Sequence, residues 1–175
     1  QTYVRECAQN KTLVTPCIEN SDFVRAERLG TCGTVLTVEG GAVLGGNLDN
    51  IPYLASCGVR MLTLTWNGTC EFGDGAMVTH PKGLTKFGRK AIPKLEQQRI
   101  VVDISHASEP LFYDAAEIAS KPLVASHSNA RAVCNHPRNL TNEQVQIIKQ
   151  SGGLIGLNFH PPFLKEDGIA TVDDL

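Results

Sequence analysis

Short apolar runs recur along the chain, and segments of helical character separate them. Five of these runs predict β-strands, at residues 34–39, 59–66, 100–106, 123–128 and 154–159. Apolar runs of this length are typical of parallel strands, which are covered on both faces. Strands that alternate with helices in this way predict an α/β fold with a parallel sheet and right-handed crossovers.

Capping residues mark where several of the intervening helices begin. Thr85 and Ser108 each precede a predicted helix in the N-cap position. Thr141 and Gln144 have capping-box spacing, and two glycines end the helix that follows them. Pro93 predicts a kink in the helix that Thr85 begins. Further helices are expected at 21–29 and at about 49–57, and the last residues look like the start of another.

The length of the chain bears on whether such a sheet can close. A closed eight-stranded α/β barrel typically needs about 250 residues, with about 200 as a minimum, and the chain has 175. We therefore expect a segment of a larger barrel, with its first and last strands missing from this chain. The competing fold is an open doubly wound sheet, whose edges would have to be covered.

Two of the predicted strands end in a histidine, at His106 and His127, and an upstream strand ends in Glu39. Carboxyl ends of parallel strands meet at one rim, where α/β folds place their chemistry. A glutamate and two histidines form a coherent ligand set for Zn²⁺ or a similar divalent ion. The alternative is that each histidine is an ordinary polar residue and that Glu39 caps a turn before Gly40.

Other polar residues belong to the same rim. Strand ends also place Trp66, Asn67, Asn158 and His160 there. Asp103, inside the strand of His106, is a candidate for orienting a neighbouring ligand, and its alternative role is an inward polar residue of a barrel layer.

Arg138 follows His127 by 11 residues and precedes a capped helix. Its guanidinium suits bidentate binding of a substrate carboxylate. A surface salt bridge is the alternative, and Arg131 competes for the same role.

Composition argues against a nucleic-acid-binding protein and against a membrane-spanning one. The net charge of −2 argues against a nucleic-acid surface. No apolar run approaches the roughly 18 residues of a membrane span. Six cysteines without a C-x-x-C pair predict reduced thiols in a cytosolic protein.

Several segments together resemble the membrane (renal) dipeptidase family of metallopeptidases, in its bacterial branch. These segments are VEGG at 38–41, LTLT at 62–65, GLTKFG at 83–88, VDISH at 102–106, SHSNAR at 126–131 and HPRNL at 136–140. Their order and spacing agree over residues 34–164. We therefore expect one domain over 1–175, with a poorly defined lead-in at 1–33, a family-like core at 34–164 and the start of a truncated unit at 165–175.

The resemblance implies a partial TIM (β/α)8 barrel and a binuclear zinc site. It implies that Glu39 is the bridging carboxylate, that His106 and His127 are ligands of one zinc ion, and that Arg138 binds the substrate carboxylate. Family members hydrolyse dipeptides, and the implied nucleophile is a metal-bridging hydroxide. A bacterial cytoplasmic location and a homodimer are compatible with it.

Three features of the family pattern are absent from the sequence. There is no H-x-D motif for the other zinc ion and no G-S-D-F-D-G motif for the acid–base aspartate. Trp66 stands where better-known members have a substrate-contacting histidine, so the resemblance makes it a candidate substrate-binding residue.

The leading hypothesis is a zinc dipeptidase whose isolated 175-residue segment is inactive. The alternatives are a barrel-derived binding protein or pseudo-enzyme, and a metal-dependent amidohydrolase acting on N-acyl amino acids.

Overall fold

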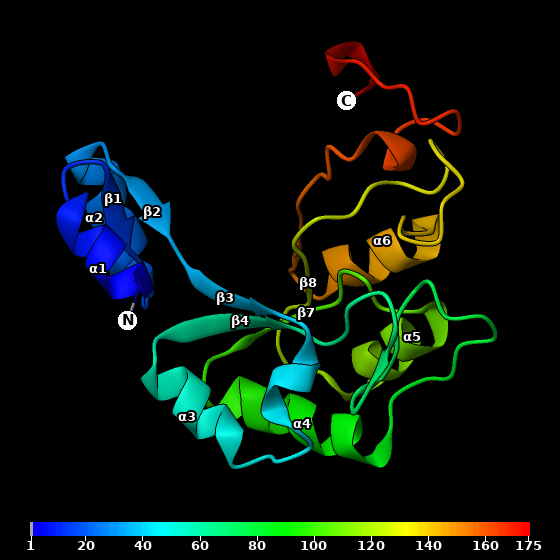
Figure 1. Ribbon diagram of the computed structural model, residues 1–175, viewed down its shortest axis with the longest axis horizontal. Coiled ribbons are helices and arrows are strands. Elements are labelled where there is room, and N and C mark those ends of the chain that lie inside the picture. Colours follow the sequence, from blue (N-terminus) through cyan, green and yellow to red (C-terminus); the bar gives the residue numbers. More distant parts are fainter. Residues whose placement is uncertain (1) are drawn as a thin grey trace.

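A five-stranded parallel sheet forms the centre of the protein in a computed structural model that describes residues 2–175 (Figure 1). Its strand order is β3-β4-β7-β8-β9, so each strand pairs with the next sheet strand along the chain. The strands are β3 (Leu36–Glu39), β4 (Val59–Thr63), β7 (Val101–Asp103), β8 (Val124–Ala125) and β9 (Leu154–Ile155). The predicted parallel α/β architecture is confirmed.

Helices connect the sheet strands and begin where the capping residues predict. They are α3 (Asn50–Ser56), α4 (Lys86–Gln97), α5 (Glu109–Ile118) and α6 (Asn142–Gln150). The Thr85 and Ser108 side chains accept hydrogen bonds from backbone N–H groups in the first turns of α4 and α5. Thr141 and Gln144 form the predicted capping box at α6. Pro93 lies within α4, which continues past it as a single helix.

The strand predicted at 34–39 is interrupted at Val35, and its two parts pair with different partners. The first part belongs to β2 (Cys32–Thr34), which pairs in parallel with β1 (Val14–Pro16), whereas β3 pairs with β4. Together with α1 (Thr2–Gln9) and α2 (Asn20–Leu29), β1 and β2 form a small lobe that projects from the sheet (Figure 1). The helix predicted at 21–29 is therefore confirmed as α2.

The remaining elements are short. A hairpin of β5 (Thr69–Cys70) and β6 (Gly73–Asp74) lies in the loop between β4 and α4, where no strand was predicted. Three 3-10 turns complete the chain: η1 (Gly41–Leu44), η2 (Pro161–Phe163) and η3 (Val172–Asp174). The apolar run at 154–159 forms a strand only over its first two residues, and the Leu157 and Phe159 side chains are exposed.

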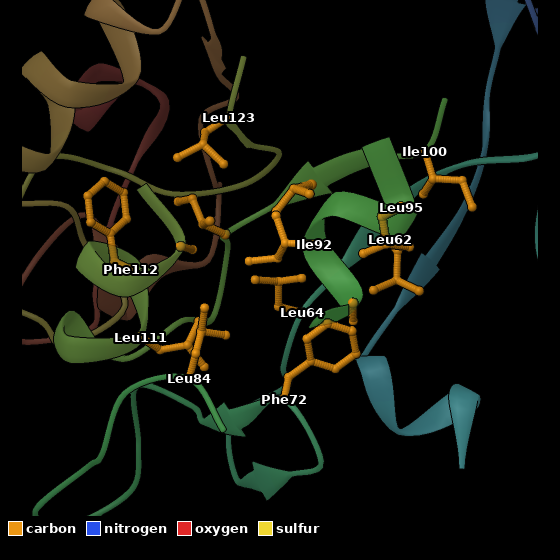
Figure 2. Close-up of a cluster of buried hydrophobic side chains, with 14 of the residues drawn as sticks. Leu62, Leu64, Phe72, Leu84, Ile92, Leu95, Ile100, Leu111, Phe112 and Leu123 are labelled. Atoms are coloured by element: carbon orange, nitrogen blue, oxygen red, sulfur yellow. The ribbon is translucent and has the colours of Figure 1, made fainter. Parts of the chain in front are cut away.

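Alternation of side chains along the strands gives the sheet two different faces. Leu62 points to the outer face, where it belongs to a buried cluster with the apolar sides of α4 and α5 (Figure 2). Val102, its partner in the register, belongs to the same cluster. Burial of each such side chain contributes about 1.5–3 kcal/mol to folding. The intervening residues point to the inner face, and the register places Thr63 opposite both Glu39 and Asp103. The register itself thus gathers polar side chains at the carboxyl ends of three neighbouring strands.

Among residues 2–175, no helix has both the length and the apolar character needed to cross a membrane.

Candidate metal centre

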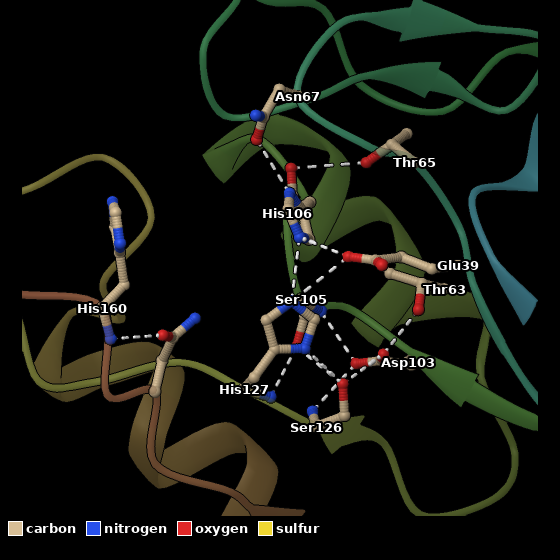
Figure 3. A network of polar contacts seen from close by, with 11 residues as sticks. Glu39, Thr63, Thr65, Asn67, Asp103, Ser105, His106, Ser126, His127 and His160 are labelled. Carbon is tan, nitrogen blue, oxygen red and sulfur yellow. Dashed lines mark hydrogen bonds and ion pairs between the residues drawn. The ribbon is translucent and has the colours of Figure 1, made fainter. Parts of the chain in front are cut away.

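Glu39, His106 and His127 meet at the carboxyl end of the sheet (Figure 3). Glu39 is the last residue of β3, while the two histidines lie in the loops that follow β7 and β8. Glu39 Oε1 lies 2.9 Å from His106 Nε2 and 3.4 Å from His127 Nε2. The two Nε2 atoms are 2.9 Å apart. The structure thus brings together the three metal-ligand candidates predicted from sequence.

The spacing of these three atoms fits a zinc ion. Ligand atoms bound to a tetrahedral zinc ion at about 2.0–2.1 Å lie roughly 3.3 Å from one another. The three observed separations, 2.9, 2.9 and 3.4 Å, differ from that value by only a few tenths of an ångström. A carboxylate with two imidazoles is also a donor set that zinc accepts. Within residues 2–175, this is the one group of three such side chains close enough to share an ion.

The backbone at His106 adopts the left-handed conformation, with φ of 67°. Such values are uncommon for residues other than glycine and are maintained by surrounding contacts. Here the carbonyl oxygen of His106 accepts hydrogen bonds from Ala76 N at 2.8 Å and from Thr65 Oγ1 at 3.3 Å. These contacts hold the chain in the turn that directs the imidazole toward Glu39.

The surroundings of His106 favour its neutral form. Only 7% of the residue is exposed, and this burial, with the nearby Arg138 and His127, lowers the pKa of its imidazole to about 3. The carboxylate of Asp103 acts in the opposite direction but is outweighed. At neutral pH the ring is therefore uncharged, so its contact with Glu39 is not an ion pair. A neutral imidazole is the form that binds metal.

His127 is held through a hydrogen-bonded series that ends in a carboxylate. Its Nδ1 lies 2.7 Å from Ser126 Oγ, and that hydroxyl donates to Asp103 Oδ2 at 2.6 Å. Because the hydroxyl proton is directed to Asp103, Ser126 Oγ is free to accept a hydrogen bond from the Nδ1–H group. The ring then presents the lone pair of Nε2 to the cluster, as a metal ligand requires.

Asp103 is completely buried, and hydrogen bonds surround its carboxylate. Oδ2 also accepts from Thr63 Oγ1 at 2.7 Å, while Oδ1 accepts from the backbone N–H groups of Ser105 and Ser126 at 3.0 Å each. These donors offset the cost of burying the charge. The structure therefore places Asp103 where sequence suggested a residue that orients a ligand.

Arg138 lines a small cavity together with His106, and it is only 4% exposed. Its Cζ is 5.4 Å from the centre of the Phe163 ring. Within residues 2–175, Nη2 has no hydrogen-bond partner. Burial lowers the pKa of the guanidinium to about 10, against the opposing effect of Asp103 and Glu39, so Arg138 remains charged at neutral pH. A buried cation with an unsatisfied donor is suited to an anionic ligand.

Arg131, the competing arginine, is engaged elsewhere. It forms a 3.0 Å ion pair with Glu109 and donates from Nε to the carbonyl oxygen of Asn139. His160 also lies apart from the three-residue cluster, with its ring 4.8 Å from that of Phe163. Arg131 and His160 therefore each have structural partners away from the cluster.

Trp66 stands at the edge of the cluster and is 59% exposed. The centre of its ring system lies 6.2 Å from that of His106. A cavity of about 540 Å³ is lined by Glu39, Val43 and Trp66, among others. The cavity adjoins the candidate ligands and has largely apolar side chains on its walls.

Asn67 contacts His106, and this contact was not expected from the sequence. It was expected at the rim, and its Oδ1 lies 2.8 Å from His106 Nδ1. The two residues belong to loops that follow different strands, so no spacing in the sequence indicates this pairing.

Known proteins resemble this chain in both sequence and structure. The "Uncharacterized protein in pqqA 5'region" of Klebsiella pneumoniae is 35% identical over 158 residues, which cover 87% of this chain and 58% of that protein. Dipeptidase 3 of Macaca fascicularis is 30% identical over 187 residues, covering 94% of this chain and 38% of that protein.

One solved structure is a metallopeptidase from Rhodobacter sphaeroides, liganded with a phosphinate mimic of the dipeptide L-Ala-D-Ala. It is 33% identical and superposes with a TM-score of 0.87 over 95% of this chain and 49% of its own. This chain thus spans about half the length of the Klebsiella and Rhodobacter proteins.

These likenesses confirm the partial TIM-barrel fold expected from the sequence. The family model for membrane dipeptidase, peptidase family M19, matches residues 1–175. The chain therefore belongs to the membrane dipeptidase family.

Proposed function

We propose that the protein takes part in zinc-dependent hydrolysis of dipeptides, with Glu39, His106 and His127 as metal ligands. The observation that carries this proposal is the convergence of one carboxylate oxygen and two imidazole nitrogens within 3.4 Å of one another. Membership of the dipeptidase family and the likeness to a metallopeptidase liganded with a dipeptide mimic support it. When bound, the ion supplies Lewis-acid polarisation of the scissile carbonyl and a water-derived nucleophile at neutral pH.

Glu39 is suited to bridging two ions. Both histidine contacts involve its Oε1, which leaves Oε2 for a second metal. The side chain is 51% exposed, so a second metal ion held by another part of the protein would be able to reach Oε2. The other zinc ion of the binuclear site would then be held by residues outside the three-residue cluster.

Arg138 is the residue that we propose to bind the carboxylate of the dipeptide. Its buried charge and its unsatisfied Nη2 suit a charge-assisted contact with an anion. The cavity that it lines with His106 and Ser128 measures about 10 Å³, enough for roughly one water molecule. This volume is too small for a carboxylate, so the proposal requires the side chains that line the cavity to move when the substrate binds.

Trp66 and the cavity of about 540 Å³ offer a place for a substrate side chain. If the carboxylate lies against Arg138 and the scissile bond at Glu39, the other residue of the dipeptide faces this cavity. Val43 and the indole of Trp66 would contact an apolar side chain there.

The test is hydrolysis of a dipeptide panel by the zinc-loaded protein, together with its metal content. In the intact protein, of which these 175 residues are a segment, the wild type is expected to bind zinc and cleave dipeptides, and His127→Ala is expected to lose both; the isolated segment is expected to be inactive. His80→Asn is the matched control, because His80 is exposed on a loop and outside the cluster. Absence of zinc from the wild type, or full activity of His127→Ala, would refute the proposal.

Two other functions make different predictions in the same experiment. An amidohydrolase acting on N-acyl amino acids also uses a free carboxylate, which Arg138 suits equally. It would cleave N-acyl amino acids in preference to dipeptides. A binding protein or pseudo-enzyme is favoured by Trp66 in the position of the family histidine. It would bind zinc and dipeptides and cleave neither class of substrate.

A further inference from the structure

Asn67 is the polar partner of His106 on the side of the ring away from the cluster. Its Oδ1 lies 2.8 Å from Nδ1, while Nε2 of the same ring faces Glu39 (Figure 3). We propose that Asn67 is a positioning residue, which fixes the tautomer and the plane of His106 so that Nε2 is presented to the metal. This inference rests on the proposed function, because it gives Nε2 the role of a ligand.

The proton count of the ring explains why an acceptor is needed at this place. A neutral imidazole carries one hydrogen, and a nitrogen that binds metal carries none. When Nε2 of His106 is the ligand, the hydrogen resides on Nδ1 and requires an acceptor in this buried setting. Asn67 Oδ1 is within hydrogen-bond distance and supplies it. The opposite orientation of the amide would place an N–H group against an N–H group.

The backbone around Asn67 is held by the same segment that holds His106. Met77 N donates to the carbonyl oxygen of Asn67 at 3.3 Å, and the adjacent Ala76 N donates to that of His106 at 2.8 Å. Gly75 permits this close approach, because a Cβ atom there would lie 2.0 Å from the carbonyl oxygen of Trp66 and 2.6 Å from the carbonyl carbon of Asn67. The amide and the imidazole are thus fixed against one another before any metal binds.

The two histidines differ in how their Nδ1 atoms are satisfied. His127 contacts Ser126 and, through it, the carboxylate of Asp103, whereas His106 contacts a neutral amide. A carboxylate partner makes a ligating imidazole more basic, while an amide orients it without adding charge. Replacing Asn67 by aspartate therefore preserves the acceptor and adds charge, and replacing it by leucine removes the acceptor at similar size.

The experiment measures zinc affinity of the full chain by competition with a chromophoric chelator, without reference to activity. We expect Asn67→Leu to lower the affinity about 10- to 100-fold, the usual cost of losing a partner of a ligand. Asn67→Asp is expected to bind zinc at least as tightly as the wild type. Asn142→Leu, an exposed asparagine on α6, is the matched control and is expected to leave zinc affinity unchanged.

Wild-type affinity in Asn67→Leu overturns the positioning role, and so does an equal loss in Asn67→Leu and Asn67→Asp. A second measurement needs no variant. In the zinc-loaded wild type, ¹⁵N NMR of labelled histidine is expected to show the proton of His106 on Nδ1, and a proton on Nε2 would also overturn the role. A wild type that binds no zinc instead refutes the proposed function, so the two failures are distinguishable.

Discussion

The two faces of the sheet are built from alternate residues of the same strands, yet they differ in burial, and near the carboxyl ends of the strands they differ in polarity. On the outer face Leu62 and Val102 are buried under helices, at 0% and 3% exposure. On the inner face, Thr63 and Asp103 form hydrogen bonds near the cluster, and Glu39 remains half-exposed. The comparison indicates that the outer face provides most of the stability, while the inner face is free to carry unsatisfied charge and strained backbone.

Removal of a metal ligand should have the largest effect on zinc affinity, and it should leave the packing of the outer face intact. We expect His106→Ala to lower zinc affinity by more than about 100-fold, beyond the range for loss of a ligand's hydrogen-bond partner. Equilibrium dialysis with zinc measures this loss, and urea unfolding of the metal-free protein checks that the fold survives. Undiminished zinc binding by this variant would show that His106 is not a ligand.

A cavity among the buried side chains of the outer face should lower the stability of the fold and leave zinc affinity nearly unchanged. Leu95 on α4 is fully buried in the core cluster, and Leu95→Ala is expected to cost about 2–5 kcal/mol of unfolding free energy. Urea denaturation measures this cost. Zinc affinity of the folded fraction should stay within a few-fold of the wild-type value, and a large loss would show that the two faces are coupled.

Acid pH should destabilise the metal-free protein through His106. Its folded-state pKa of about 3 lies below the ordinary value of 6.5, so the unfolded chain binds more protons between these pH values. The free energy of unfolding therefore rises with pH across this window, and the stability is lost as pH falls toward 3.

Urea titrations between pH 3 and 7, with a chelator present, measure this dependence. His106→Gln is the matched comparison, and it should reduce the total change in unfolding free energy over this pH range by up to a few kcal/mol, at about 1.4 kcal/mol per pKa unit. Equal slopes in the two proteins would show that His106 titrates normally and that burial does not keep it neutral.

Arg138 is expected to affect substrate binding without supporting the fold. Loss of a charge-assisted contact worth about 1.5–3 kcal/mol should raise KM of Arg138→Leu for dipeptides roughly 10- to 100-fold. Stability should be unchanged or higher, because an unsatisfied buried cation has been removed. Steady-state kinetics and urea unfolding measure the two effects, and a destabilised variant with normal KM would assign Arg138 to the fold instead.

Trp66 should have the smallest effect. Trp66→Ala is expected to change kcat/KM only a few-fold, by about 1 kcal/mol, and only for dipeptides with a large apolar residue. Alanyl dipeptides are the matched control substrates. An equal loss for both kinds of dipeptide would place Trp66 outside the side-chain cavity.

Local sequence signals anticipated those parts of the molecule that depend on neighbouring residues. Ser108 and the Thr141–Gln144 box mark helix starts because the cap satisfies backbone groups a few residues away. The cluster was also predictable, because parallel strands in chain order align their carboxyl ends, and with them Glu39, His106 and His127.

Contacts between distant loops were not predictable in this way. The break at Val35 arises because β2 and β3 pair with different strands, which no apolar pattern records. The β5–β6 hairpin is too short to show alternation. Asn67 reaches His106 across 39 residues and only through the loop that the hairpin shapes.

The most direct test of the account is anomalous diffraction at the zinc edge from crystals of the zinc-loaded protein. We expect a peak about 2.0–2.2 Å from Glu39 Oε1, His106 Nε2 and His127 Nε2. Zinc at full occupancy elsewhere, with no peak among these three atoms, would contradict it.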